Sequence, residues 1–277
     1  MPGYDDYTIE SLSELSRRVR IHVIEMTSEA GSGHPGGSLS STEIMVSLFF
    51  HVMHHNAQNP TWKSRDRFVL SKGHVAPVYY AVLAEAGYFP VEELKTLRKL
   101  GSRLQGHPAY GKLPGIEMST GSLGQGISVA NGMALAARLD DMDYRVYCLC
   151  GDGEMQSGQN WEAGMLAAHY KLDNLVVFLD RNRLQIMGGT EDVMALEPLG
   201  DKWRAFGWNV LEIDGHDIRQ ILEACEKAKE FSGPVMIIAD TVKGRGVSFM
   251  ENNCGFHGRC CTSDERLKAV QELGGPL

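Results

Sequence analysis

The fold is decided by residues 145–185, RVYCLCGDGEMQSGQNWEAGMLAAHYKLDNLVVFLDRNRLQ, in which two apolar runs flank a helical segment. The runs RVYCLC and NLVVFLD are continuous in apolar character rather than alternating, as is typical of parallel strands covered on both faces. Residues 160–170 between them predict a helix. The stretch therefore predicts a strand, a crossover helix and a second, parallel strand.

The same pattern extends along the chain. Further strands are predicted at RFVLS from Arg67, NVLEID from Asn209 and PVMIIAD from Pro234, with a helix over 218–231. Near the start, apolar residues recur every three to four positions between Ile9 and Met26, which predicts an amphipathic helix. We therefore expect an α/β fold, a doubly wound and mostly parallel sheet with helices on both faces. No linker or repeat divides the sequence, so a single domain over residues 1–277 is expected.

Glycine-rich segments lie between the predicted helices and strands. The segment GSGHPGGS, residues 31–38, is a cluster of helix breakers and predicts a loop. Ser40 and Glu43 have the spacing of a capping box and predict the start of the next helix. Another helix is predicted after TGSLGQG, with Val129, Met133, Leu135 and Ala136 within it.

The amino-acid composition argues against some classes of function. The 277 residues carry a net charge of −8 and no basic run, which argues against a general nucleic-acid binder. Small anions remain possible ligands because a few local donors suffice to bind phosphate. No apolar run approaches the roughly 20 residues that span a bilayer, and MPGYDDYTIE lacks the layout of a signal peptide. The six cysteines show no zinc-ligand spacing, and we expect them to be reduced in a cytoplasmic protein.

Polar segments follow two of the predicted strands. GDGEMQSGQ begins at Gly151 and DRNRLQ at Asp180, at strand ends where α/β sheets bind ligands. Asp152 and Asn182 could converge on one ion, because a carboxylate, an amide oxygen, a backbone carbonyl and ligand phosphates make a hard oxygen site. Gly153 would let the backbone approach a phosphate closely. GDG alone is equally typical of a tight turn, but its pairing with D-x-N-x-x-Q indicates a phosphate and metal site; GxxxxGK[ST] and an early GxGxxG are absent.

A GDG segment, a helix and a strand ending in an asparagine segment together resemble the thiamine-diphosphate-binding motif. From about residue 8 to about residue 258 the chain resembles the transketolase family, and its motifs follow in this order: SGHPGGSLSSTEIM, DRFVLSKGH, GSRLQGHP, TGSLGQGIS, GDGEMQSGQNWEA, KLDNLVVFLDRNRLQ, DGHD and DTVKGRG. The resemblance implies thiamine diphosphate as the cofactor, with Mg²⁺ as the metal and Ca²⁺ or Mn²⁺ as alternatives. It implies metal ligands at Asp152, Asn182 and the main chain of Leu184, and cofactor contacts from His74, Gly121, Leu123, Gly153, Asn182 and His257.

The resemblance also implies residues for substrate and catalysis. His34, His107 and His257 would surround the reacting carbon, where proton transfer near neutral pH suits histidine. Arg98 is similar to a family residue that grips substrate phosphate, so that His34, Arg98 and His107 would bind substrate. Glu162 would join a carboxylate network that reaches across a dimer and serves catalysis. Four further histidines are expected to be structural or solvated: His22, His51, His54 and His55.

Two departures from the family pattern affect the expectations. Ser157 stands where transketolases usually carry a glutamate of the same carboxylate network. The pyrimidine-binding domain, whose glutamate activates the cofactor in the family, has no counterpart before Leu277. We therefore expect a partner chain, a C-terminal transketolase subunit with the pyrimidine-binding and C-terminal domains, in a heterotetramer with two copies of each chain.

The expected reaction is the transfer of a two-carbon ketol unit from a ketose phosphate to an aldose phosphate. Two rival functions remain open from the sequence. One is another thiamine-diphosphate enzyme, similar to 1-deoxyxylulose-phosphate synthase or to the α chain of a 2-oxoacid dehydrogenase. The other is a non-catalytic cofactor-binding subunit. Neither nucleic acid nor a membrane is expected as a partner.

Overall fold

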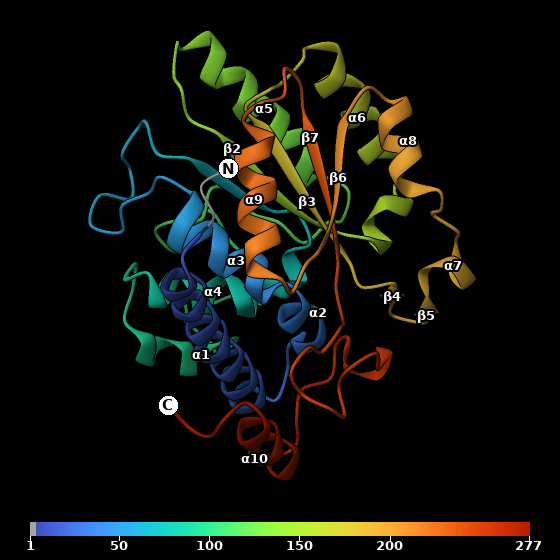
Figure 1. Cartoon of the computed structure of the whole chain (residues 1–277). Coiled ribbons are helices and arrows are strands. Elements are labelled where there is room, and N and C mark those ends of the chain that lie inside the picture. The colour runs from blue at the N-terminus through green and yellow to red at the C-terminus, as the bar shows by residue number, and fades with distance from the viewer. Residues whose placement is uncertain (1–3) are drawn as a thin grey trace.

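A five-stranded parallel sheet forms the centre of the computed structural model, which describes residues 4–277 (Figure 1). The strands lie in the order β1-β2-β3-β7-β6, and every neighbouring pair is parallel. Their bounds are β1 Arg67–Leu70, β2 Val146–Gly151, β3 Leu175–Arg181, β6 Asn209–Asp214 and β7 Val235–Asp240. A separate antiparallel pair follows β3 and consists of β4 Leu184–Gln185 and β5 Gly188–Gly189. The expected α/β sheet is confirmed.

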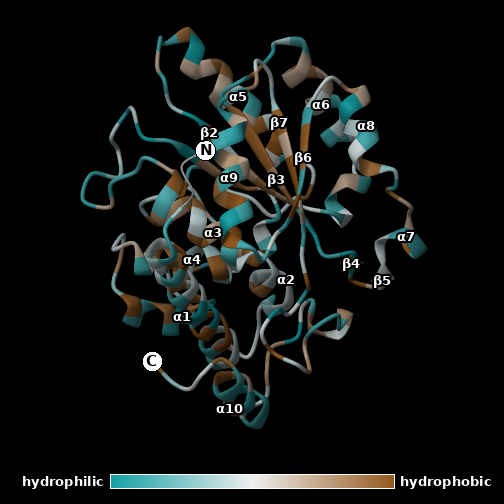
Figure 2. Cartoon of the chain, viewed as in Figure 1, coloured by the Kyte–Doolittle hydropathy of each residue, from teal (hydrophilic) through white to brown (hydrophobic). Residues whose placement is uncertain are grey.

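Helices cover both faces of the sheet. The hydrophobic core on one face includes residues of α3 Thr42–Ser47, α4 Ala76–Glu85 and α9 Ile218–Ala228, and α1 Asp6–Ala30 packs against these helices. The other face packs against α5 Gly126–Leu139, α6 Gly158–His169 and α8 Leu199–Ala205. Alternate residues of a strand enter opposite cores: Tyr147 and Leu149 of β2 join the first, and Val146, Cys148 and Cys150 join the second. Both faces of β1, β2, β3 and β7 are buried, which explains their continuous apolar runs and the hydrophobic colour of the strands in Figure 2. The edge strand β6 is only partly buried.

The chain path places a switch point at the carboxyl ends of β3 and β7. The connection from β2 to β3 runs through α6 on one face, whereas the connection from β6 to β7 runs through α9 on the opposite face. Neighbouring connections therefore diverge between β3 and β7, and in such sheets ligands bind at this position. The remaining α-helices of the described residues are α2 Pro35–Ser40, α7 Thr190–Val193 and α10 Ser263–Glu272, of which α10 packs against α1 (Figure 1).

The prediction of a loop over residues 31–38 is wrong in its second half, because α2 begins at Pro35. Proline suits the first turn of a helix, where its missing N–H costs no hydrogen bond. The glycines serve close packing here: a Cβ on Gly36 would lie 2.9 Å from the carbonyl oxygen of Phe256, and one on Gly37 would lie 2.9 Å from Val75 Cγ1. Only Gly31 and Gly33, which have positive φ angles, act as helix breakers.

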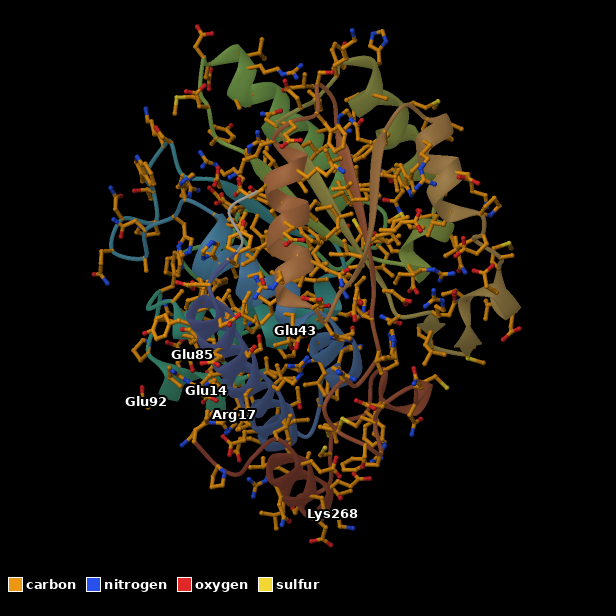
Figure 3. All side chains as sticks on the ribbon, in the orientation of Figure 1. Glu14, Arg17, Glu43, Glu85, Glu92 and Lys268 are labelled. Atoms are coloured by element: carbon orange, nitrogen blue, oxygen red, sulfur yellow. The ribbon has the colours of Figure 1, made fainter. Side chains whose placement is uncertain are left out.

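The predicted capping box is also wrong. The N-cap of α3 is Ser41, and no side chain caps the helix. Ser40 Oγ donates instead to Asp180 Oδ2 at 2.6 Å. The Glu43 carboxylate, which is labelled in Figure 3, accepts hydrogen bonds from Arg20 Nη2 at 2.6 Å and His216 Nδ1 at 3.0 Å. The Ser40 and Glu43 side chains are buried, so tertiary partners replace the local capping contacts.

Within residues 4–277 no helix combines the length and apolar character that a membrane span requires. The six cysteines are free thiols.

Candidate functional site

A cavity of about 320 Å³ lies at the carboxyl ends of β2 and β3, beside the switch point. Its lining includes every residue that the sequence assigns to the cofactor or the metal: His74, Gly121, Leu123, Asp152, Gly153, Asn182, Leu184 and His257. It also includes His34, which the sequence assigns to substrate and catalysis. The rest of its lining is Gly37, Lys72, Gly151, Glu154, Gln185, Ile186 and Lys243. A larger hollow of about 790 Å³ lies beyond the ends of β6 and β7 and shares Asn182 and Leu184 with it. We take the smaller cavity as the candidate site because the acidic, histidine and glycine residues converge there.

Oxygen atoms of three residues form the candidate metal site. Asp152 Oδ1 accepts from the Gly153 backbone N–H at 2.8 Å, and its Oδ2 accepts from the Arg183 backbone N–H at 2.5 Å. Asn182 Nδ2 donates to Asp180, which orients the amide, and Asn182 Oδ1 accepts from the Leu184 backbone N–H at 3.1 Å. Among the described residues no cluster of three His, Cys, Asp or Glu side chains could hold a metal. An ion would therefore depend on this mixed oxygen set together with ligand oxygens.

Two buried lysines give the cavity positive charge. Lys72 follows β1 and donates to Ser41 Oγ at 2.7 Å and to the carboxylate of Asp180. Lys243 follows β7, and its Nζ donates to the Leu184 carbonyl oxygen at 3.1 Å. Burial lowers the pKa of Lys243. The sequence predictions missed both lysines, although VLSKGH and DTVKGRG contain them; the available signal was a lysine beside glycine directly after a buried strand.

The sequence predictions also missed two buried carboxylates: Glu154, which lines the cavity, and Asp180, which lies behind it. Burial raises the pKa of Asp180, but the charge of Lys72 and several hydrogen bonds outweigh it and hold the pKa at about 2. Glu154 accepts from Ser71 Oγ and from the backbone N–H groups of Gly124 at 2.8 Å and Gly151 at 3.1 Å. Burial nevertheless raises the pKa of Glu154. These carboxylates hold the strand ends and the glycine-rich segment together.

Three histidines form a compact cluster on one wall. The ring centroids of His34 and His74 lie 5.2 Å apart, those of His34 and His257 lie 5.5 Å apart, and those of His74 and His257 lie 5.2 Å apart. Burial lowers the pKa of His34 and of His257 to about 4. The pKa of His74 is lowered by burial and then by the nearby charge of Lys72. The three imidazoles are therefore neutral at pH 7 and can each offer one donor and one acceptor.

Arg98 and His107 lie beside the cavity rather than in its lining. Arg98 Nη1 donates to Ser32 Oγ at 2.7 Å, and its Nη2 lies 3.4 Å from His34 Nδ1. The His107 ring lies against Gly121, where an added Cβ would be 3.1 Å from the ring. Burial, and then the charge of Arg98, lower the pKa of His107.

Glu162 and Ser157 lie away from the cavity lining. Glu162 is exposed on α6, so its expected role in a network across two chains stays a prediction. Ser157 precedes α6 as its N-cap residue, and its Oγ occupies the space that a Cβ on Gly124 would need.

The shape and donors of the cavity fit thiamine diphosphate with a divalent metal. Gly153 leaves room that a side chain would fill, since an added Cβ would lie 3.3 Å from Gln185 Cβ. Gly121 has a φ of 144°, a conformation that favours glycine. His257 Nδ1 is buried and has no hydrogen-bond partner among the described residues, which leaves it for a ligand. Lysine ammonium groups and glycine backbone suit a diphosphate, and the carboxylate and amide oxygens suit Mg²⁺.

Comparison with known proteins gives the same family. The model of the family "Transketolase, thiamine diphosphate binding domain" matches residues 12–275. A 6-deoxy-6-sulfo-D-fructose transketolase subunit of Clostridium sp. (strain MSTE9) is 47% identical over 92% of this chain and 93% of its own length. An apulose-4-phosphate transketolase subunit of Actinobacillus succinogenes is 43% identical over 98% of this chain and 97% of its own length.

The fold agrees with a solved transketolase. The crystal structure of transketolase from Campylobacter jejuni superposes with a TM-score of 0.91 at 36% identity, over 96% of this chain and 43% of that one. The chain thus spans nearly the whole of the two subunits and less than half of the longer enzyme. It belongs to the transketolase family of enzymes and corresponds to the family's thiamine diphosphate-binding domain.

Proposed function

We propose that the cavity binds thiamine diphosphate through Mg²⁺, and that the chain transfers a two-carbon ketol unit from a ketose phosphate to an aldose phosphate together with a partner subunit. One observation carries the proposal: Asp152, Asn182 and the Leu184 carbonyl share a cavity with two buried lysines. The cavity also lies beside the switch point at the carboxyl ends of the strands, the region where α/β sheets bind ligands.

The diphosphate and metal have separate donors in this proposal. Asp152, Asn182 and the Leu184 carbonyl oxygen would bind the metal, and Lys243 would leave the Leu184 oxygen and turn toward a phosphate. Ca²⁺ or Mn²⁺ could replace Mg²⁺ at a hard oxygen site. Gly153 and His74 would contact the diphosphate, and Gly121 and Leu123 would line the aminopyrimidine.

Thiamine diphosphate, when bound, supplies the carbon nucleophile and electron sink for breaking and forming the carbon–carbon bond. Proton transfer is the task that we assign to His34, His107 and His257. All three have lowered pKa values, so at neutral pH they start as proton acceptors. Arg98 reaches His34 and would bind the anionic end of the sugar.

The surface beside the cavity supports a partner subunit. Ile186 and Met187 are 66% and 83% exposed, and Leu123 and Met194 are exposed as well. Ile186 and Leu123 belong to the cavity lining, so apolar surface adjoins the site. Exposed apolar groups beside a site mark a place for association. We propose that the partner is a C-terminal transketolase subunit, that it covers this surface, and that it forms an assembly with two copies of each chain.

The test is a ketol-transfer assay of the chain with its candidate partner, comparing the wild type with Asp152→Asn. Loss of activity in the variant supports the proposed site, whereas full activity favours a non-catalytic subunit. Pyruvate in place of the ketose phosphate tests the other thiamine-diphosphate enzymes. Turnover with pyruvate and none with ketose phosphates would replace the proposed reaction.

A further inference from the structure

We propose that Arg181 is a positioning residue, which holds the segment 184–197 as a wall of the cofactor cavity and at the same time fixes the carboxylate of Asp152. Arg181 is the last residue of β3, and its side chain is 3% exposed. The effect on cofactor binding rests on the proposed function, but the effect on the segment itself does not.

The guanidinium group of Arg181 donates hydrogen bonds both to Asp152 and to the segment 184–197. Nη1 donates to Asp152 Oδ2 at 3.2 Å and to Thr190 Oγ1 at 2.7 Å. Nη2 donates to Glu191 Oε1 and Glu197 Oε1, each at 2.9 Å. Among the described residues only the Nε of this group lacks a partner. One side chain therefore joins a candidate metal ligand to three residues of the segment that follows.

The two glutamates that Arg181 binds also accept hydrogen bonds from backbone N–H groups. The Glu191 carboxylate accepts from the backbone N–H groups of Leu196, at 3.1 and 3.2 Å, and of Glu197, at 3.3 Å. Glu197 Oε2 accepts from the Leu199 backbone N–H at 2.7 Å, at the start of α8. Arg181 thus fixes two carboxylates, and these carboxylates bind the backbone of the residues just before α8 and at its start.

The segment has little regular structure of its own to hold it. β4 and β5 are two residues each and α7 is four residues, lengths at which backbone hydrogen bonding alone is marginal. Its tip is exposed at Ile186 and Met187. In Figure 1 β4, β5 and α7 lie at the lower right, at the edge of the molecule. The position of the segment must therefore come from side-chain anchors.

This segment forms part of the cavity. Gln185 and Ile186 line it, and Gln185 Cβ lies 3.3 Å from the Cβ position of Gly153. Gln156 provides a second anchor, since its Nε2 donates to Gln185 Oε1 at 2.8 Å and to the Met194 carbonyl oxygen at 2.9 Å. Gln156 carries no charge, whereas Arg181 bonds to three carboxylates. We therefore assign the larger share of the anchoring to Arg181.

Lysine cannot replace arginine at this position. The four acceptors of Arg181 are divided between two nitrogens of a planar group, a geometry that a single ammonium nitrogen does not reproduce. Asp152 keeps its two backbone donors when Arg181 is removed, so its carboxylate stays partly satisfied. Removing Arg181 should therefore loosen the segment more than it disturbs the sheet.

The experiment compares Arg181→Met with the wild type by hydrogen–deuterium exchange of the chain without cofactor. Peptides covering residues 184–199 should exchange at least about tenfold faster in the variant, while peptides of β2 and β7 stay unchanged. The control is Arg138→Met, because Arg138 pairs on the surface with Asp173, remote from the cavity lining. The double variant Glu191→Gln, Glu197→Gln removes the exposed carboxylates and should give an intermediate increase.

Calorimetric titration of the chain and its partner with thiamine diphosphate and Mg²⁺ then measures how the substitution changes cofactor affinity. The dissociation constant should rise about tenfold in Arg181→Met, and Arg181→Lys should recover only part of the loss. With the partner and saturating cofactor, kcat should stay within about threefold of the wild type, because the residue positions the site without touching substrate.

Unchanged exchange over 184–199 in Arg181→Met would overturn the inference. Where that variant fails to fold, wild-type exchange in the double glutamine variant overturns it instead. A wild-type chain and partner that fail to bind thiamine diphosphate would refute the proposed function. The exchange result would still decide whether Arg181 holds the segment.

Discussion

Lys72, which lines the candidate site, forms an ion pair with Asp180 behind it, and the two side chains are only 2% and 0% exposed. The Asp180 carboxylate also accepts hydrogen bonds from the hydroxyl groups of Ser40, Ser41 and Thr241. These donors come from α2, from its C-cap and from the residue after β7. The pair therefore ties the floor of the cavity to elements far apart in the sequence.

Replacing Asp180 by Asn should destabilise the fold by about 3–5 kcal/mol, because it leaves the ammonium of Lys72 buried without its charged partner. Urea unfolding followed by circular dichroism measures the free energy of unfolding. The matched control is Asp173→Asn, which breaks the exposed pair with Arg138 and should cost at most about 1 kcal/mol. Equal losses in the two variants would contradict the assigned role of the buried pair.

The histidine cluster should titrate in the acid range. Burial holds the pKa of His34 and His257 at about 4, below the ordinary 6.5. The unfolded chain takes up these protons first, so the stabilising effect of the neutral imidazoles is present above pH 6.5 and declines as the pH falls from there toward 4. NMR titration of the histidine rings, assigned with His34→Asn and His257→Asn, gives the values. Midpoints near 6.5 for both rings in the folded chain would refute this prediction.

Asp152→Asn should weaken binding of thiamine diphosphate with Mg²⁺ by at least about a hundredfold, since Asp152 is the one charged side chain among the three residues of the candidate metal site. Calorimetric titration of the assembled enzyme measures the affinity. The control Asp140→Asn changes an exposed carboxylate at the C-cap of α5 and should leave the affinity unchanged. An affinity of Asp152→Asn within threefold of the wild type would place the metal elsewhere.

Arg98→Met should raise KM for phosphorylated sugars by about 10- to 100-fold, because a charge-assisted hydrogen bond to phosphate contributes roughly 1.5–3 kcal/mol. The expected binding position follows from the contact of Arg98 with Ser32 and His34 beside the cavity. Steady-state kinetics with a sugar phosphate and its dephosphorylated analogue distinguish phosphate binding from general damage. Equal losses for both substrates would assign Arg98 to support of His34 instead.

The architecture could be predicted because it depends on sequence patterns that are local or periodic. Continuous apolar runs marked all five strands of the sheet, and the polar segments after β2 and β3 pointed to the cavity. Glycines were misread in α2 because their role depends on neighbours: Gly36 approaches Phe256, which lies far along the chain. The capping-box prediction failed for the same reason, since Glu43 finds Arg20 and His216 instead of its own backbone.

The electrostatics of the site could not be derived from sequence. Lys72 and Asp180 are 108 positions apart and meet only because β1, β2 and β3 lie side by side. The four acceptors of Arg181 likewise depend on how the chain after β3 turns back toward Asp152. Spacing along the chain identifies which residues follow a strand. It does not identify which charges then become partners.

The most direct measurement is a ketol-transfer assay with xylulose 5-phosphate, ribose 5-phosphate, thiamine diphosphate and Mg²⁺. One reaction contains this chain alone, and the other contains this chain together with a candidate C-terminal transketolase subunit. We predict transfer only in the mixture, and its loss when Asp152→Asn replaces the wild type. Transfer by the chain alone would contradict the account, because the activating carboxylate would then lie within these 277 residues.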